Sequence, residues 1–357
     1  MRFRTALMEG LGLDHPIILA PMGGATTVDL AVAACEAGAL GFLASAYLTP
    51  EQIREESRQL KVRTSRAFGN NLFVSQPPPA EPSNAGVALD RLTAFHAELG
   101  LPPPSLPTFT GDQFDEKLAA VLDGGAPVFS FTFGIPSPAA MQVLKARVRF
   151  VMGTATSVDE AVALERAGAD AVIAQGSEAG AHRGTFGAAF EAAMIGTMAL
   201  VPQVVDAVKV PLVASGGIMD GRGIAAALAL GASAVQMGTA FLTCDEAGIA
   251  EVYKDAILKA DEHDTRVTRA FSGRPARGIV NRAMEEIDAA ADDGSILPYP
   301  LQNMLTRPMR NAAAKLGRAE YLSLWAGQGV RLARRQSAKE LIARLVNETD
   351  AAIARLR

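Results

Sequence analysis

The chain has 357 residues, of which 49% are hydrophobic and 20% charged, and its formal net charge is −4. This composition is typical of a globular protein with enough apolar material for one large domain or two modest ones. The small negative charge provides no broad basic field, which argues against a nucleic-acid partner or an anionic membrane surface.

No apolar run approaches the roughly 20 residues of a membrane-spanning helix, and the first residues carry an apolar stretch too short for a signal peptide. We therefore expect a cytoplasmic protein. The two cysteines, Cys35 and Cys244, are too few for a disulfide framework, and we expect both to be structural. The sequence leaves the oligomeric state open, with a homodimer as one option.

The chain repeats one pattern, in which a helix-like segment ends at a glycine and runs into a short apolar strand. Gly38, Gly168 and Gly231 each stand just before such a strand. Alternating helices and strands indicate a parallel sheet of the α/β class. We predict eight parallel strands, which imply a closed TIM (β/α)8 barrel, at residues 17–20, 39–44, 67–72, 128–131, 148–152, 171–174, 212–214 and 234–237.

Two helix starts are recognisable from their capping residues. Thr49 is followed by proline at the first helical position and by Gln52 at the third, the spacing of a capping box. Ser157 and Glu160 have the same spacing. Both patterns predict that the third residue's side chain returns to the backbone N–H of the capping residue.

The most informative stretch is residues 212–239, which reads as strand, glycine turn, helix and strand. Asp220 is placed to cap the helix, and Gly231 follows its last turn. The two strands end at Gly216-Gly217 and at Gly238-Thr239. Such turns let backbone N–H groups approach a ligand closely, and phosphate is the expected guest.

We divide the chain into a barrel over residues 1–244, a smaller and mostly helical cap over 245–336, and a C-terminal helix over 337–357 that packs on the barrel. Residues 74–125 are too many for one crossover and contain two proline runs, so we expect an excursion with one or two helices around the barrel rim. Within the last third, residues 247–259 and 309–357 are predicted to be helical.

In a β/α barrel the functional groups lie in loops after the carboxyl ends of the strands. Six strand ends here carry glycine or polar residues, which together favour a large planar ligand that bears a phosphate. His182 lies in one of these loops, and its ordinary pKa suits proton transfer at neutral pH. A surface role for His182 is the alternative, and Glu178 is expected to cap a backbone or bind an arginine. We expect His15, His96 and His263 to be structural.

Seven strings carry a resemblance to a known family. They are APMGG (20–24), GNNLF (69–73), SFTFGIP (130–136), QGSEAGAHRG (175–184), ASGGIMDGRG (214–223), VQMGTAFL (235–242) and FSGRPARG (271–278). In this order they resemble those of the nitronate monooxygenases, class I members in particular. The resemblance implies an FMN-containing TIM barrel that oxidises alkyl nitronates, propionate 3-nitronate among them, with dioxygen to a carbonyl compound and nitrite.

Carried over by motif, the resemblance implies His182 as the active-site histidine, acting as a base toward neutral nitroalkanes or positioning a nitronate anion. Some family members have histidine where this chain has Thr132, so the substrate contact there is an open question. Tyr299 and Arg274 are implied to close the pocket from the cap. The residues implied to bind FMN are Met22, Gly23, Asn70, Gln175, Gly180, Gly216, Gly217, Gln236, Met237, Gly238 and Thr239.

Two other functions compete with this one. A flavin-dependent enoyl-acyl-carrier-protein reductase has a similar barrel and would use NAD(P)H to reduce the flavin. A barrel that binds a phosphate-bearing ligand without chemistry is the third reading. The GNNLF and FSGRPARG strings favour the nitronate oxidase.

Overall fold

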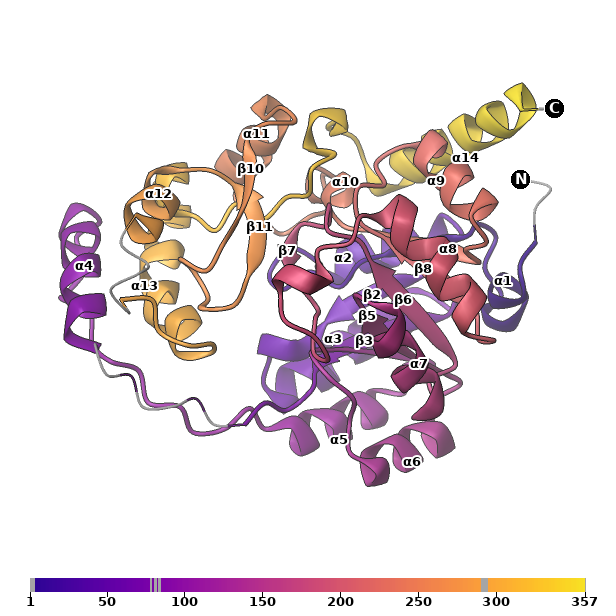
Figure 1. The fold of residues 1–357 in the computed structure, drawn as a ribbon, viewed down its shortest axis with the longest axis horizontal. Coiled ribbons are helices and arrows are strands. Elements are labelled where there is room, and N and C mark those ends of the chain that lie inside the picture. Colours follow the sequence, from indigo (N-terminus) through magenta and orange to yellow (C-terminus); the bar gives the residue numbers. More distant parts are fainter. Residues whose placement is uncertain (1–3, 78, 80–81, 83–84, 290–294, 357) are drawn as a thin grey trace.

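The computed structural model describes residues 4–77, 79, 82, 85–289 and 295–356. Among these residues, eight parallel strands form a barrel (Figure 1), which confirms the predicted fold class. Their hydrogen-bonded order is β1-β9-β8-β6-β5-β4-β3-β2. Every predicted strand is present, with ends shifted by a few residues: β1 (Ile17–Leu19), β2 (Gly41–Ala44), β3 (Phe68–Phe73), β4 (Val128–Thr132), β5 (Phe150–Ala155), β6 (Ala171–Gln175), β8 (Leu212–Ser215) and β9 (Ala234–Met237).

The barrel closes between its first two strands. Ile18 and Leu40 form a parallel bridge, and the Leu19 N–H donates to the carbonyl oxygen of Leu40 at 2.9 Å. At the amino-terminal end, α1 (Ala6–Leu11) buries Leu7 and Met8 against inward-facing strand residues, so it plugs that end of the barrel. The opposite, carboxyl end of the strands is therefore the one left for a ligand.

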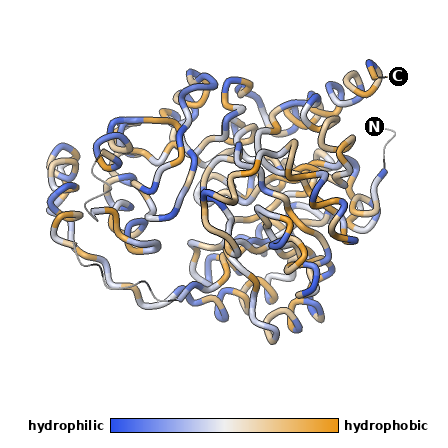
Figure 2. Tube along the Cα trace, in the orientation of Figure 1, coloured by the Kyte–Doolittle hydropathy of each residue, from blue (hydrophilic) through white to orange (hydrophobic). Residues whose placement is uncertain are grey.

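Helices cover the outside of the barrel, and hydrophilic residues alternate with hydrophobic ones along them (Figure 2). The C-terminal α14 packs on α9 and α2, as the sequence predicted for residues 337–357. The helices of this layer are α2 (Val28–Glu36), α3 (Pro50–Arg63), α5 (Phe114–Gly124), α6 (Pro138–Arg147), α7 (Val158–Arg166), α8 (Thr197–Ala207), α9 (Gly221–Ala229), the short α10 (Thr239–Leu242) and α14 (Ala338–Arg355).

The capping predictions fare differently. The Thr49 capping box forms in full, and Asp220 accepts from the N–H groups of Arg222 and Gly223. Ser157 accepts from the Glu160 N–H as expected, but the predicted return contact is wrong. The buried Glu160 carboxylate instead accepts from Thr156, Phe186 and Gly187 N–H groups, because the loop after β7 offers it more donors than the cap does.

A second, smaller hydrophobic core lies beside the barrel mouth (Figure 1). It contains helices as predicted, and also a three-stranded antiparallel sheet that the sequence did not indicate. In this sheet β11 pairs with β10 on one side and, on the other, with β7, a short strand that follows β6 in the chain. The elements are α11 (Glu251–Lys259), α12 (Arg282–Asp288), α13 (Leu301–Leu316), β10 (Thr265–Thr268), β11 (Ala276–Ile279) and β7 (Ala181–His182).

Two expectations for these regions need correction. The excursion over residues 74–125, parts of which lie outside the described residues, does not wrap the rim: α4 (Ala85–Glu98) packs in the second core, while α5 returns to the barrel. The helix expected over residues 309–357 is interrupted, because α13 ends at Gly317 with a φ of 67°. Residues 318–336 contain short 3₁₀ turns at Ala319–Tyr321 and Val330–Leu332 and isolated β-bridges at Trp325 and Gln336, but no α-helix.

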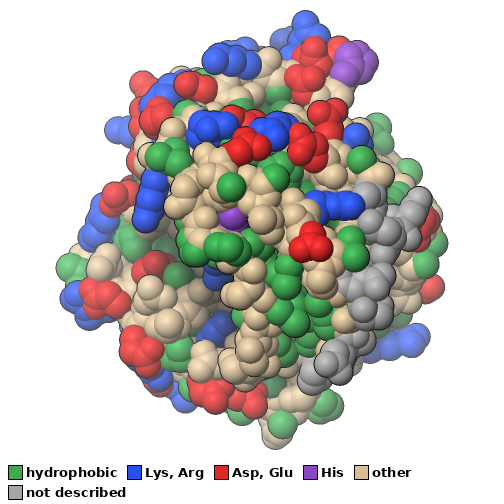
Figure 3. Space-filling view, turned by 90° about the vertical axis from the view of Figure 1, so that its left-hand side faces the viewer, with side chains coloured by type: hydrophobic (Ala, Val, Ile, Leu, Met, Phe, Trp, Pro, Cys, Tyr) green, Lys and Arg blue, Asp and Glu red, His purple; other side chains and the backbone are tan. Residues whose placement is uncertain are grey.

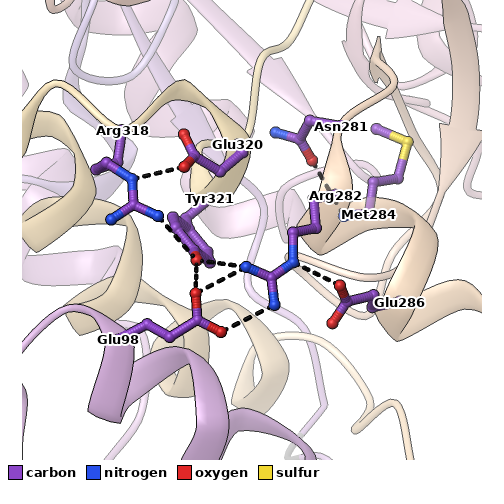
Figure 4. A network of polar contacts seen from close by, with 8 residues as sticks. All are labelled: Glu98, Asn281, Arg282, Met284, Glu286, Arg318, Glu320 and Tyr321. Carbon is purple, nitrogen blue, oxygen red and sulfur yellow. Dashed lines mark hydrogen bonds and ion pairs between the residues drawn. The ribbon is translucent and has the colours of Figure 1, made fainter.

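A network of polar contacts holds α4 in the second domain (Figure 4). Arg282 forms two hydrogen bonds with the Glu98 carboxylate, at 2.7 and 2.8 Å. The Tyr321 hydroxyl donates to the same carboxylate, and Phe95 packs edge-on against the Tyr321 ring. Ion pairs and aromatic contacts thus join α4 to residues that lie 184 positions (Arg282) and 223 positions (Tyr321) after Glu98.

Figure 3 shows the side of the molecule on which the second domain lies, and acidic and basic side chains are interspersed there. Within the described part of the chain, none of the helices combines the length and apolar character needed to cross a bilayer.

Cys35 and Cys244 are buried and unpaired, and burial raises their thiol pKa values to about 11 and about 12. Both thiols therefore stay protonated at neutral pH, which suits a structural role.

Candidate active site

A cavity of about 430 Å³ lies between the carboxyl ends of the barrel strands and the second domain. This volume falls in the range of small-molecule and cofactor sites. Most of the wall comes from loops of the barrel, and α13 together with residues 323–329 supplies the remainder. The predicted residues that line it are Met22, Gly23, Thr132, Gln175, Gly180, His182, Gly216, Gly217, Gln236, Met237, Gly238 and Thr239.

Asn70 is an exception, and the structure corrects it to Asn71. Asn70 is fully buried on the outer side of β3, where it accepts from the Ser45 hydroxyl and donates to the Ser57 hydroxyl. Asn71 faces the cavity and donates to Ser130 at 2.8 Å. Successive side chains of a strand point to opposite faces, so an error of one residue moves the amide across the sheet.

Glycines from several loops meet at one end of the cavity. Gly216 and Gly217 adopt φ values of 112° and 70°, which favour glycine. A Cβ on Gly180 would lie 2.6 Å from the backbone of Ala326, and one on Gly327 would lie 2.6 Å from the carbonyl oxygen of Glu178. These backbones therefore approach each other as closely as the missing side chains allow, and they form a cradle for a compact polar group.

Two glutamines in the cavity wall, Gln236 and Gln175, differ in whether the protein already provides hydrogen-bond partners for their amide oxygens. The Oε1 atom of Gln236 is buried and has no hydrogen-bond partner, so it is free to contact a ligand. The Gln175 amide, by contrast, is engaged by the protein: Nε2 donates to the His182 carbonyl oxygen at 3.0 Å, and Oε1 accepts from the Gly184 N–H at 2.8 Å. Gln175 therefore fastens the loop that carries His182 to the end of β6.

The His182 side chain is oriented by Ser272. The Nε2 atom of His182 lies 2.9 Å from the Ser272 Oγ, and that hydroxyl donates its single hydrogen to the Arg274 carbonyl oxygen at 3.0 Å. Ser272 must then accept from His182, which puts the imidazole proton on Nε2 and leaves Nδ1 unprotonated. Neither the role of Ser272 nor this tautomer was apparent from the sequence.

Aromatic rings surround the imidazole. The rings of Phe73, Phe133, Tyr299 and Trp325 have centroids between 5.8 and 6.4 Å from that of His182. Tyr299 packs against His182 and Phe133 from the second domain, and it is not itself among the residues that line the cavity. These contacts hold the imidazole in an environment with little water.

Arginines make the surroundings of His182 positive. Arg307 and Arg310 line the cavity, and the Arg274 guanidinium lies 3.9 Å from the centre of the Phe133 ring. The cavity lining within the described residues contains no carboxylate. Burial, together with the charges of Arg274 and Arg310, lowers the pKa of His182 from 6.5 to about 3. The imidazole is therefore neutral at physiological pH.

The two domains meet over the cavity at a pair of tyrosines. Tyr47 of the barrel interacts through its hydroxyl with Tyr299, and the Arg307 guanidinium lies 5.1 Å from the centre of the Tyr47 ring. Burial raises the phenol pKa of both tyrosines, so both stay protonated. The predicted Thr132 faces the cavity with its hydroxyl 3.4 Å from that of Thr154.

Sequence reasoning missed most of the cavity residues that come from the last third of the chain. Trp325, Gly327 and Gly329 lie in the string WAGQG, whose paired glycines could have signalled a close backbone approach. The Gly327 N–H donates to the Thr239 hydroxyl at 3.0 Å, so this string closes over the glycine cradle. Glu178 caps the Thr197 N–H with both oxygens at 2.9 Å, the capping role that was expected.

Comparison with known proteins agrees with this architecture. The family model described as nitronate monooxygenase matches residues 4–348. The chain is therefore a member of the nitronate monooxygenase family and an oxidoreductase.

Individual relatives cover nearly the whole chain. A probable nitronate monooxygenase of Staphylococcus aureus (strain Newman) is 41% identical over 352 residues, which are 97% of this chain and 98% of the relative. The solved structure of a nitroalkane oxidase from Streptomyces ansochromogenes aligns with a TM-score of 0.91 and 43% identity, covering 99% of this chain and 100% of that one. FabK from Thermotoga maritima aligns with a TM-score of 0.80 and 31% identity, covering 99% of each chain.

Proposed function

We propose that this protein is an FMN-dependent nitronate monooxygenase that oxidises alkyl nitronates with dioxygen to a carbonyl compound and nitrite, with propionate 3-nitronate as the preferred substrate. The family membership and the likeness to a nitroalkane oxidase support the reaction class. The observation that carries the substrate proposal is a cavity that contains arginines and a neutral histidine but, within the described residues, no carboxylate.

The cavity fits FMN at two points. The glycine cradle of Gly180, Gly216, Gly217 and Gly327 suits the phosphate, since backbone N–H groups reach an anion closely there, and Gly238 and Thr239 line the cavity as well. The unpartnered Oε1 of Gln236 suits the polar edge of the ring system, with Met22 and Gly23 beside it. When bound, FMN supplies the redox chemistry between nitronate and dioxygen.

The arginines suit an anionic substrate. Arg310 is oriented by hydrogen bonds of 2.8 Å to the carbonyl oxygen and side chain of Asn303. Arg307 lies over the Tyr47 ring at the junction of the domains. A substrate with a nitronate at one end and a carboxylate at the other would place one charge near His182 and the other near these guanidinium groups. We accordingly propose the barrel as the cofactor domain and the second domain as the substrate domain.

His182 has two roles in this proposal. A nitronate arrives as an anion and needs no base, so the neutral imidazole positions it among the surrounding rings. A neutral nitroalkane must lose a proton, and the unprotonated Nδ1 of His182 accepts it. The low pKa of His182 makes it a weak base, which favours nitronates over neutral nitroalkanes as substrates.

An enoyl-acyl-carrier-protein reductase is the alternative that has to be separated by experiment. The purified yellow protein is incubated aerobically with propionate 3-nitronate while oxygen uptake and nitrite are measured. A second sample is mixed anaerobically with NADPH while flavin absorbance is followed. We expect oxygen uptake with nitrite and slow bleaching by NADPH. Rapid bleaching without nitrite production would replace our proposal with the reductase, and a colourless protein that refuses FMN would remove both.

Two further properties remain predictions. We expect the protein to be cytoplasmic, which fractionation of cells that express it would test. The homodimer considered from the sequence would be tested by light scattering of the FMN-loaded protein.

A further inference from the structure

Two arginines are buried together on the side of β7 that faces away from the main cavity. Arg183 is 6% exposed and Arg277 is 8% exposed, and both line a second, much smaller cavity. Arg277 lies on β11 and pairs with Ala181 of β7, and Arg183 directly follows β7, where its N–H donates to the Pro275 carbonyl oxygen at 2.9 Å. Neither arginine has an ion pair among the described residues, although buried charges are ordinarily paired.

The hydrogen bonds of these arginines leave donors unused. Arg183 donates through its Nη atoms to Gln175 and to the Ala193 carbonyl oxygen, while its Nε atom is buried without a partner. Arg277 makes only long contacts, at 3.3 Å to the Ser177 carbonyl oxygen and at 3.4 Å to Thr265. Two cations thus line the cavity, and one of them, Arg183, carries an unsatisfied buried N–H.

The nearest carboxylates are committed elsewhere. Glu178 uses both oxygens on Thr197. Glu160 accepts from Thr156, Phe186 and Gly187, which occupy both of its oxygens. Both carboxylates act on Arg183 at longer range, and neither forms a contact pair with it. The local positive charge therefore lacks a direct partner from the protein.

We propose that this cavity binds a monoatomic inorganic anion of the size of chloride. The cavity is small, at about 10 Å³, which suits a single compact ion better than phosphate, sulfate or a carboxylate. An anion there would accept from the Arg183 Nε–H and would draw the Arg277 guanidinium into a shorter contact. The remaining lining is largely apolar, with Phe190, Met194 and Val267 on the outer side.

An anion bound in this cavity would affect the loop that carries His182 without touching the substrate. Gln175, Ala179 and Ala181 line both cavities, so the anion and the main cavity share a wall. Ala181 has a φ of 61°, an unusual conformation for a residue with a side chain, and it directly precedes His182. A bound anion would tie β7 to β11 at this point and would stabilise that conformation.

The test uses the FMN-loaded protein in two salts at the same ionic strength, sodium chloride and sodium gluconate. We expect the thermal midpoint to be about 2 °C or more higher in chloride, because the anion binds the native state alone. Crystals soaked in sodium bromide should show an anomalous peak between Arg183 and Arg277. Equal midpoints in both salts would overturn the proposal, whether the peak is absent or appears at crystal concentrations only.

Two variants separate this site from general salt effects. Arg277→Met should abolish the difference between the salts. Arg266→Met is the matched control, because Arg266 lies on the adjacent strand β10 with its side chain 47% exposed, and it should keep the difference. If both variants lost the difference in thermal midpoint between the two salts, the proposed anion site would be contradicted. Should Arg277→Met fail to fold, the chloride and bromide measurements on the unmodified protein decide the question.

Discussion

Replacing His182 by asparagine separates the two roles that we propose for the imidazole. Asparagine keeps a polar side chain in the aromatic surroundings and removes the ring nitrogen that accepts a proton. We expect turnover of neutral nitroethane to fall by about 10² to 10⁴-fold, the usual contribution of a general base. Turnover of the pre-formed nitronate should fall by less than about tenfold, since that substrate arrives without the proton.

The pKa of His182 determines how the turnover of nitroethane and of its nitronate depends on pH. A pKa lowered from 6.5 to about 3 means that protonating the imidazole costs on the order of 5 kcal/mol more in the folded protein than in water. His182 therefore stays neutral throughout the range from pH 5 to 8. In the unmodified protein, kcat/KM for a nitronate should show no limb from His182 in that range.

The assay measures oxygen uptake and nitrite for both substrate forms over pH 5 to 8, with flavin content determined for each sample. His263→Asn is the matched control, because the His263 side chain is 85% exposed and far from any ring around His182. It should behave like the unmodified protein. Equal losses of His182→Asn on the nitroalkane and the nitronate, with FMN retained, would refute the role of His182 as a base.

Four further predictions follow from the site. Ser272→Ala removes the group that fixes the tautomer of His182, so nitroethane turnover should fall about tenfold while nitronate turnover and FMN content stay nearly constant. Gly217→Ala places a Cβ 3.1 Å from that of Glu178 at a φ of 70°, and flavin content after purification should drop sharply, whereas Gly86→Ala, with nothing within 4 Å, should retain it. Arg307→Met should raise KM for propionate 3-nitronate about tenfold or more and leave KM for ethyl nitronate nearly unchanged; equal changes would exclude a carboxylate contact. Because the pKa of His182 is lower in the folded than in the unfolded protein, stability should fall as pH drops below 6.5, by about 2 kcal/mol at pH 5, and urea unfolding of His182→Asn should lack this component.

The barrel could be predicted because its signals are local. Each strand is a short apolar run that ends at glycine or at a polar residue, and the capping residues Thr49 and Asp220 mark helix starts within a few positions. The glycines at the strand ends also pointed to the cavity, since backbone that approaches backbone requires them.

Other features depend on contacts between distant parts of the chain, which a local pattern does not show. The choice between Asn70 and Asn71 depends on which face of β3 meets the helices, and both are flanked by similar residues. Two of the three partners of Glu160, Phe186 and Gly187, lie in a loop more than twenty residues away. The contact between His182 and Ser272 crosses 90 positions, and residues 318–336 are shaped by the second core and not by their own helix propensity.

The position of α4 has a consequence for synthesis of the chain. Glu98 and Tyr321, which contact each other, are separated by 223 residues. At ribosomal rates of about 5 to 20 residues per second, α4 leaves the exit tunnel on the order of 10 to 45 s before this partner exists. During that time its apolar residues Leu92 and Phe95 have no core to enter. The nascent protein therefore passes through a stage in which all eight barrel strands have been made but α14 has not, and α4 still lacks Tyr321; a chaperone would engage the exposed apolar face of α4 at this stage.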